Sequence, residues 1–176
     1  MATTPRVCIF CGGTPVTSEH AWPQWIAKYL PRTKVPHLVL KQYEGRDDTY
    51  SFRGERLPFT TTVRCVCLHC NSGWMHELEG TAEPLLSPLI QGKSQVWHEW
   101  KQALAATWAF KTMALLEYAV GEISIPAEVM PLFRRFLTPP PGTQVWTGVY
   151  TGSGQHQFGS GAMRMLLVDE DGNVAH

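Results

Sequence analysis

Large apolar side chains recur at helical spacing through the central part of the chain. Their intervals are three, four or seven residues, as on one face of a helix, and the set comprises Trp97, Trp100, Leu104, Trp108 and Leu115. We therefore predict an amphipathic helix over Trp97–Ala119 whose stripe packs in the hydrophobic core. An aromatic stripe of this kind could alternatively stack on nucleic-acid bases. A second helix is predicted over Pro126–Leu137.

Strand signals occur on both sides of these helices. The segment Thr60–Leu68 is rich in Thr and Val, residues that favour extended backbone. Four further strands are predicted on weaker patterns, at Val7–Phe10, His37–Tyr43, Val145–Thr151 and Met163–Val168. The rest of residues 31–61 is polar and is expected to be irregular, with a turn at Gly45–Asp48.

Proline positions limit the helices expected in the first half of the chain. A short helix or turn is predicted at Ala21–Leu30, which Pro31 ends. A helix that opens at Asn71 should run through Glu79. Two prolines follow and predict breaks soon afterwards, at Pro84 and Pro88.

These elements together predict an α+β fold in two parts. Residues 1–80 would form a small module, and residues 81–176 an α+β segment with the Trp-rich helix and C-terminal strands. The chain is 44% hydrophobic and has seven Trp, enough apolar surface to bury a core. No stretch between the parts is typical of a flexible linker, so the two could pack as one unit.

Charge and hydropathy narrow the location and the partners. Residues 1–70 hold nine Lys and Arg against five Asp and Glu, whereas residues 71–176 hold six against ten. A basic first half on a neutral chain favours a phosphate-facing surface there, or is ordinary solvated charge. The chain has no export-signal pattern at its start, and Lys111 and Glu117 interrupt its longest apolar stretch. We expect a cytoplasmic protein without a membrane span.

Two Cys-x-x-Cys pairs carry the clearest chemistry. The first is Cys8-Ile-Phe-Cys11 and the second is Cys67-Leu-His-Cys70. Two intervening residues let both thiolates of a pair reach one tetrahedral ion at about 2.3 Å. In a reducing compartment such pairs usually hold metal rather than form disulfides. We therefore predict one structural zinc ion bound by all four thiolates, a closed site that would stabilise the fold and not catalyse.

The fifth cysteine is Cys65, two residues before the second pair. Pairing it with Cys70 would need a longer spacing, so Cys67 is the favoured ligand. Cys65 is then a buried strand thiol or a spare ligand.

The residues around the two pairs resemble the HNH (His-Me finger) nucleases, in particular their zinc-bearing branch. In that pattern an acidic residue and a His follow the first pair, and an Asn or His directly follows the second. The matching residues here are Ser18-Glu19-His20, Pro23 and Cys70-Asn71, so the resemblance covers about residues 7–80. It implies that residues 1–80 form a zinc-stabilised ββα-metal finger.

The resemblance also implies a metal-dependent endonuclease that hydrolyses phosphodiester bonds in DNA. His20 would be the general base, while Glu19 and Asn71 would bind one catalytic Mg²⁺ or Mn²⁺. Arg64 and Lys28 are candidate phosphate contacts, and related branched-DNA nucleases make a homodimer possible.

Three positions depart from the family pattern. Glu19 replaces the usual Asp, Asn71 replaces the final His, and Thr62 stands near the position of the middle Asn that steadies the loop of the base. Thr62 could make only part of that Asn's hydrogen bonds. The alternative hypothesis is therefore a catalytically weakened, zinc-held module that binds nucleic acid or a protein. An enzyme of another class, with a site in residues 81–176, is a third reading without a supporting motif.

Overall fold

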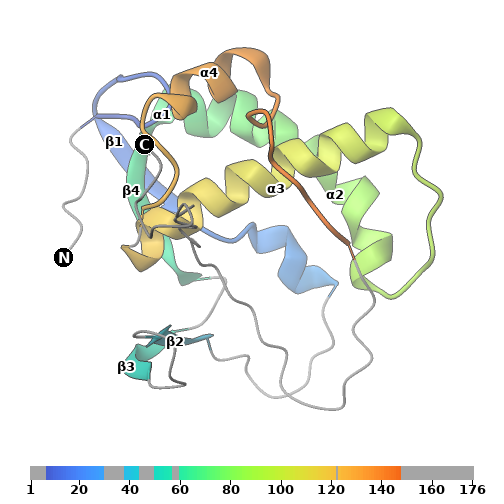
Figure 1. Ribbon diagram of the computed structural model, residues 1–176, viewed down its shortest axis with the longest axis horizontal. Coiled ribbons are helices and arrows are strands. Elements are labelled where there is room, and N and C mark those ends of the chain that lie inside the picture. The colour runs from blue at the N-terminus through green and yellow to red at the C-terminus, as the bar shows by residue number, and fades with distance from the viewer. Residues whose placement is uncertain (1–6, 30–37, 44–49, 57–59, 122, 148–176) are drawn as a thin grey trace, which may run out of the picture.

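An antiparallel strand pair frames one end of the molecule. The computed structural model describes residues 7–29, 38–43, 50–56, 60–121 and 123–147. Strand β1 (Val16–His20) pairs with β4 (Thr62–Cys67), and the register shifts at a bulge between Thr17 and Glu19. The predicted strand at Thr60–Leu68 is confirmed as β4, whereas β1 was not anticipated. Figure 1 shows the pair beside one end of the long helix α3.

The chain between these strands contributes two further elements. A 3-10 helix, η1 (Gln24–Lys28), follows β1 and matches the short helix predicted at Ala21–Leu30. Strands β2 (Leu38–Tyr43) and β3 (Tyr50–Arg56) form a separate antiparallel pair. The first matches the strand predicted at His37–Tyr43. The second corrects the expectation of irregular backbone, while the turn predicted at Gly45–Asp48 lies outside the described residues.

A helical run follows β4 without a loop. It consists of α1 (Leu68–Cys70), the π-helical turn η3 (Asn71–Met75) and α2 (His76–Ile90). Gly73 has non-helical backbone angles inside this run, which accommodates the wider turn. The predicted breaks at Pro84 and Pro88 are wrong, because α2 continues through both. Buried Leu85 and Leu86 anchor this part of α2 and offset the lost backbone hydrogen bonds.

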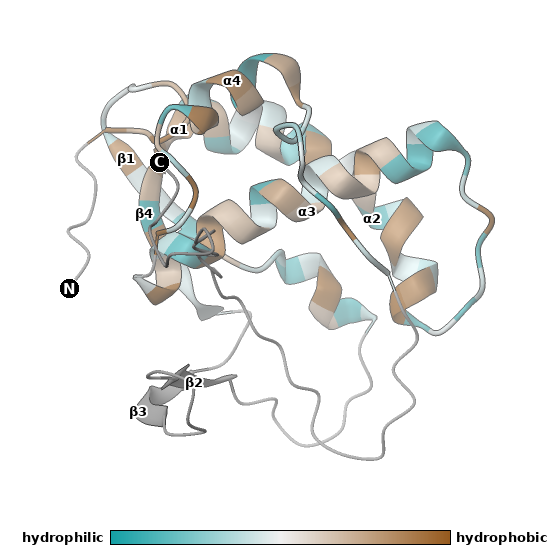
Figure 2. Cartoon of the chain, in the orientation of Figure 1, coloured by the Kyte–Doolittle hydropathy of each residue, from teal (hydrophilic) through white to brown (hydrophobic). Residues whose placement is uncertain are grey.

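Helices α3 (Glu99–Val120) and α4 (Val129–Phe136) confirm the two predicted helices, with starts two and three residues later. The predicted stripe is only partly correct, since Leu115 is fully buried but Trp100 is 62% exposed. Figure 2 shows apolar residues along much of α3. Other parts of the protein cover more than one side of α3, so its buried residues do not form a single stripe. For this reason the spacing of the large apolar residues did not identify the buried surface of the helix.

Two other predicted strands are corrected in part. Val7–Phe10 forms a turn because Cys8 and Gly13 close a tight loop there. Residues 145–147 have no regular structure, and the remainder of the strand predicted to Thr151 lies outside the described residues, as does Met163–Val168.

The core joins residues from both predicted parts of the chain. Phe10 of the first cysteine turn packs on Trp74 of η3 at 5.1 Å between ring centroids, and on Phe133 of α4 at 6.3 Å. Phe110 of α3 completes this cluster, 4.7 Å from Phe133. Helix α2 also runs across residue 80, where the sequence placed a boundary. The described residues thus form a mixed α and β fold with two small two-stranded sheets.

Among the helices that the structure describes in residues 7–147, none combines the length and the apolar character of a membrane-spanning helix.

Candidate metal centre and the adjoining polar cluster

The first cysteine pair lies in a tight turn that brings both thiols to one side. The backbone N–H of Cys8 donates to Gly13 O at 2.9 Å, and that of Gly12 donates to Cys8 O at 2.8 Å. Gly12 has φ +72°, a conformation that favours glycine. A Cβ added at Gly13 would lie 3.3 Å from Cys11 Sγ. Both glycines therefore serve the close turn around the sulfur atoms.

The second pair comes from the junction of β4 with the helical run. Cys67 is the last residue of β4, and Cys70 is the last residue of α1. Ligand atoms of all four cysteines lie within 4.8 Å of one another, and Cys11 Sγ and Cys67 Sγ are 3.5 Å apart. Thiolates on a tetrahedral zinc at about 2.3 Å would be roughly 3.8 Å apart. The four sulfurs thus fit a metal ion such as zinc, as the sequence predicts.

The thiols of this cluster differ in acidity. Burial raises the pKa of Cys70 to about 12, although the neighbouring Trp74 acts in the opposite direction. Burial acts to raise the pKa of Cys67 as well, but the backbone N–H of Cys70 and the neighbouring cysteines together lower it. Because a bound metal needs thiolates, binding would release protons from the thiols.

Cys65 lies apart from this cluster. It is fully buried in β4, and burial raises its thiol pKa to about 12. Its carbonyl accepts a hydrogen bond of 2.9 Å from Ile9 N, which ties the first cysteine turn to the strand. Of the two readings left open by the sequence, the buried strand thiol matches this position.

The polar residues singled out by the sequence meet beside the strand pair. His20 faces Thr62 in the β1–β4 register, and Ala21 N donates to Thr61 O at 3.0 Å. The side chain of Asn71, the first residue of η3, lies near enough to Glu19 to lower the pKa of its carboxyl group. The strand pair thus places Glu19 and His20 opposite Val63 and Thr62, and Asn71, which follows the other end of β4, acts on Glu19.

The carboxyl group of Glu19 lies in a low-dielectric environment. Burial raises its pKa above the usual value of 4.5. The positive charge of Lys111 and the hydrogen bond from Asn71 partly offset this effect, whereas the charge of Glu79 adds to it. Carboxylate and amide oxygens are both of the ligand type that hard divalent cations take.

One nitrogen of the His20 ring has a partner. Gln24 Nε2 of η1 lies 3.1 Å from His20 Nε2. The Gln24 amide either donates to this nitrogen or, turned over, accepts from it, since the two orientations are equivalent in shape. Gln24 was not identified from the sequence, although it lies four residues after His20.

The two candidate phosphate contacts have different surroundings. Arg64 is exposed on β4, and its Nη2 lies 3.5 Å from Val16 O, a long contact. Lys28 forms an ion pair of 3.1 Å with Glu83 of α2, and its side chain is 65% exposed. Arg64 is thus the freer of the two cations.

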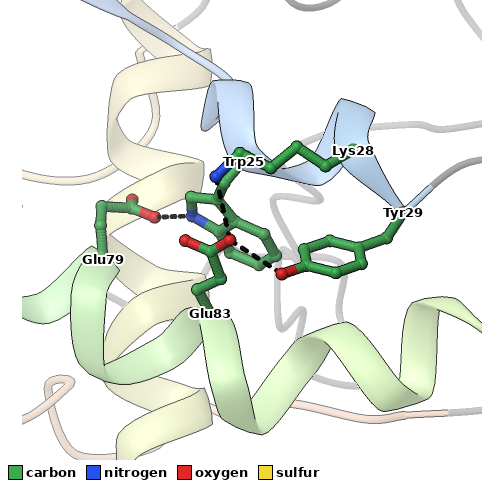
Figure 3. Close-up of polar contacts among 5 residues, drawn as sticks. All are labelled: Trp25, Lys28, Tyr29, Glu79 and Glu83. Carbon is green, nitrogen blue, oxygen red and sulfur yellow. Dashed lines mark hydrogen bonds and ion pairs between the residues drawn. The ribbon is translucent and has the colours of Figure 1, made fainter.

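Sequence reasoning missed a second polar cluster under this site. Glu79 of α2 accepts hydrogen bonds from Trp25 Nε1 at 2.5 Å and from Trp108 Nε1 at 3.0 Å, and it forms an ion pair with Lys111. Figure 3 shows the bond from Trp25 and, one turn further along α2, Glu83 with Lys28 and Tyr29. The sequence does contain a sign of this cluster, because Lys111 is a charged residue inside the apolar stretch of α3. A buried lysine needs a negatively charged partner, but the sequence does not show which residue provides it.

No protein-family model, curated protein or solved structure matches this chain. A functional proposal therefore has to be argued from the residues of the site.

Proposed function

We propose that this protein is an HNH-type endonuclease that hydrolyses phosphodiester bonds in DNA with one divalent ion, Mg²⁺ or Mn²⁺. The observation that carries the proposal is that Glu19 and His20 lie side by side at the end of β1, paired with β4, while Asn71 of η3 is near enough to act on the Glu19 carboxyl group. These residues come from separate elements, and each is of the type required by the proposed chemistry. The four-cysteine cluster lies at the other end of the strand pair, where Val16 faces Cys67, and its last member, Cys70, directly precedes Asn71.

His20 would act as the general base. A neutral imidazole can remove a proton from the attacking water near neutral pH. With its oxygen turned toward His20 Nε2, the Gln24 amide would leave Nδ1 free to take that proton. Thr62, opposite His20 across the strand pair, would steady the strand end that carries the base.

Glu19 and Asn71 would hold the divalent ion. Glu19 would offer a carboxylate oxygen to this ion and Asn71 its amide oxygen. When bound, the ion would neutralise charge on the scissile phosphate and on the leaving oxygen. Arg64 would contact a neighbouring phosphate from the exposed face of β4.

The cysteine cluster would serve as the frame of this site. Zinc bound by Cys8, Cys11, Cys67 and Cys70 would hold the turn before β1 against the junction that leads into Asn71. The ion would thereby fix the distance between the strand that carries Glu19 and His20 and the helix that carries Asn71. Its four protein ligands leave no position for substrate.

The test is cleavage of supercoiled plasmid DNA by the purified protein with Mg²⁺ or Mn²⁺. We expect His20→Ala to lower the rate about 100-fold or more while the zinc content stays unchanged. His98→Ala is the matched control, because His98 is exposed at the start of α3 and should keep full activity. Undiminished cleavage by His20→Ala would overturn the mechanism.

The same preparation distinguishes the alternative, a zinc-held binding module. The observation in its favour is Thr62, which supplies fewer hydrogen bonds than the Asn of the family pattern. Tight DNA binding that weakens steeply with salt, without cleavage in several divalent ions, would support this module and contradict the nuclease.

A further inference from the structure

Helix α4 presents both cationic and apolar side chains to solvent. Its packed side carries Met130 and Phe133, which are buried in the core. On the other side Leu132 is 57% exposed and Phe136 is 64% exposed. Residues three and four apart share one side of a helix, so the exposed Arg135 lies on this side with Leu132 and Phe136. One side of α4 therefore holds it in the core, and the other is available to a partner.

The charge of this part of the chain is positive. Residues 129–147 contain Arg134 and Arg135 but no Asp, Glu or Lys. Neither arginine forms an ion pair with another of the described residues. This stretch differs from its surroundings, because residues 71–176 as a whole hold six Lys and Arg against ten Asp and Glu. A negatively charged partner would complement it.

Both guanidinium groups lie over aromatic rings. Arg135 Cζ is 5.3 Å from the centroid of the Phe136 ring, and Arg134 Cζ is 5.4 Å from that of Trp74 in η3. Arginine N–H groups match the oxygens of a phosphate in geometry and charge. Phe136 is mostly exposed, so its ring also has surface left for another planar group. A cation beside an exposed ring is the combination that contacts a phosphate and stacks on a base.

The end of α4 is held in a fixed position. Leu137 ends the helix with a φ of +48°, a left-handed conformation that bulky residues rarely adopt. Its N–H donates to Phe133 O at 2.7 Å, and its carbonyl oxygen accepts from Thr107 Oγ1 of α3 at 2.8 Å. These bonds fix the backbone next to Phe136, so a base that stacks on the ring would meet a preorganised surface.

We propose that the exposed side of α4 binds single-stranded DNA, with Arg135 on a phosphate and Phe136 stacked on an unpaired base. The bases of a duplex stack on one another, so an exposed ring reaches the face of a base only where the strands are separated. A helix that lies on a membrane has its cationic and apolar residues on opposite faces, whereas α4 has them on one side. The inference rests on the proposed function for its choice of DNA and narrows that substrate to DNA with unpaired bases.

The test is the fluorescence anisotropy of a labelled oligothymidylate, titrated with the zinc-loaded protein without added Mg²⁺ or Mn²⁺, beside a labelled duplex. We expect Phe136→Ala to raise the dissociation constant of the single strand about tenfold, as loss of one stacked base does, and that of the duplex less than about twofold. Arg135→Gln should also weaken single-strand binding. It should reduce the slope of log affinity against log salt by about 0.7, the value for one phosphate contact.

Trp100→Ala is the matched control for Phe136→Ala. Trp100 is 62% exposed, and Lys101 Nζ lies 5.5 Å from the centroid of its ring, but it stands at the start of α3 directly after Glu99. This variant should leave both dissociation constants unchanged. Because both aromatic side chains are exposed, both variants should keep the thermal unfolding transition of the wild type. A loss of affinity at Trp100 as large as that at Phe136 would overturn the assignment to α4.

The other outcomes separate this inference from the proposed function. Unchanged single-strand affinity in Phe136→Ala would overturn the inference, while plasmid cleavage by the wild type would still support the nuclease. Single-strand binding that depends on Phe136, without cleavage in any divalent ion, would support the inference and contradict the nuclease. Binding to phosphatidylserine vesicles but not to oligothymidylate, with loss of that binding in Phe136→Ala, would make α4 a lipid-binding helix and overturn the inference as well.

Discussion

Two clusters of side chains stabilise this molecule, and they differ in how they are built. The four cysteines come from two short motifs, and their sulfurs gather within 4.8 Å of one another. The cluster around Glu79 draws Trp25, Trp108 and Lys111 from three elements with no shared motif. The first would be completed by an ion from outside, whereas the second is complete in the protein itself.

The cysteine cluster and the Glu79 cluster should differ in how they respond when one of their residues is replaced. A metal site with three ligands keeps part of its affinity, but the fold depends on whether the ion stays bound. A buried ion pair without one partner leaves an uncompensated charge, and removal of both partners costs much less. The two clusters should therefore respond differently to single and double changes.

The largest effect is expected from the cysteine cluster. Cys70→Ser, or removal of the metal by a chelator, should abolish the cooperative thermal unfolding transition, because structural zinc contributes about 10–16 kcal/mol of binding free energy in small zinc domains. Circular dichroism and the zinc content of the protein measure this. Cys65→Ala is the control and should keep the metal; loss of zinc in this variant would make Cys65 a ligand.

The ion pair should give the next largest effect. Lys111→Met should lower the free energy of unfolding by about 3 kcal/mol, since it leaves the part-buried Glu79 carboxylate without its cation, and Glu79→Gln in the same protein should recover most of that loss. Lys28→Met, which breaks the exposed pair with Glu83, should cost no more than about 1 kcal/mol. Chemical denaturation measures all three values. Equal losses at Lys28 and Lys111 would contradict the difference in burial.

The pH dependence of cation binding should sharpen the comparison at Glu19. Because burial raises the pKa of Glu19 above 4.5, protonation should begin to compete with Mn²⁺ at a higher pH than for an ordinary glutamate. Affinity is therefore expected to be full above the raised pKa and to fall as the pH is lowered through it. Titration of Mn²⁺ at several pH values measures this. A midpoint below 4.5 would show that the site stabilises the carboxylate.

The smallest effect is expected at the exposed end of α3. Trp100→Ser should change the free energy of unfolding by no more than about 0.5 kcal/mol, because this side chain is 62% exposed. Trp108→Phe should cost about 1–3 kcal/mol, since it removes a hydrogen bond to the part-buried Glu79 carboxylate. Thermal and chemical denaturation compare the two variants. A larger loss at Trp100 would restore the single-stripe interpretation of this helix.

Local patterns predicted much of the secondary structure and part of the site. The spacing of the cysteines indicated the metal cluster, and helical periodicity located α3 and α4 to within three residues at their starts. The same reasoning failed at Pro84 and Pro88, where packing of α2 outweighs the local preference of proline. It also failed at Trp100, because periodicity identifies a helix more reliably than the neighbours that cover it.

The sequence by itself determined the four-cysteine motif pair and the presence of Glu19, His20 and Asn71 beside it. Only the tertiary structure decided that Asn71 lies near enough to act on Glu19, that Thr62 faces His20, and that Lys111 is buried against Glu79. The reason is physical. A metal motif is specified by the short reach of two thiolates around one ion, whereas a buried charge finds its partner through the packing of helices that are distant in sequence.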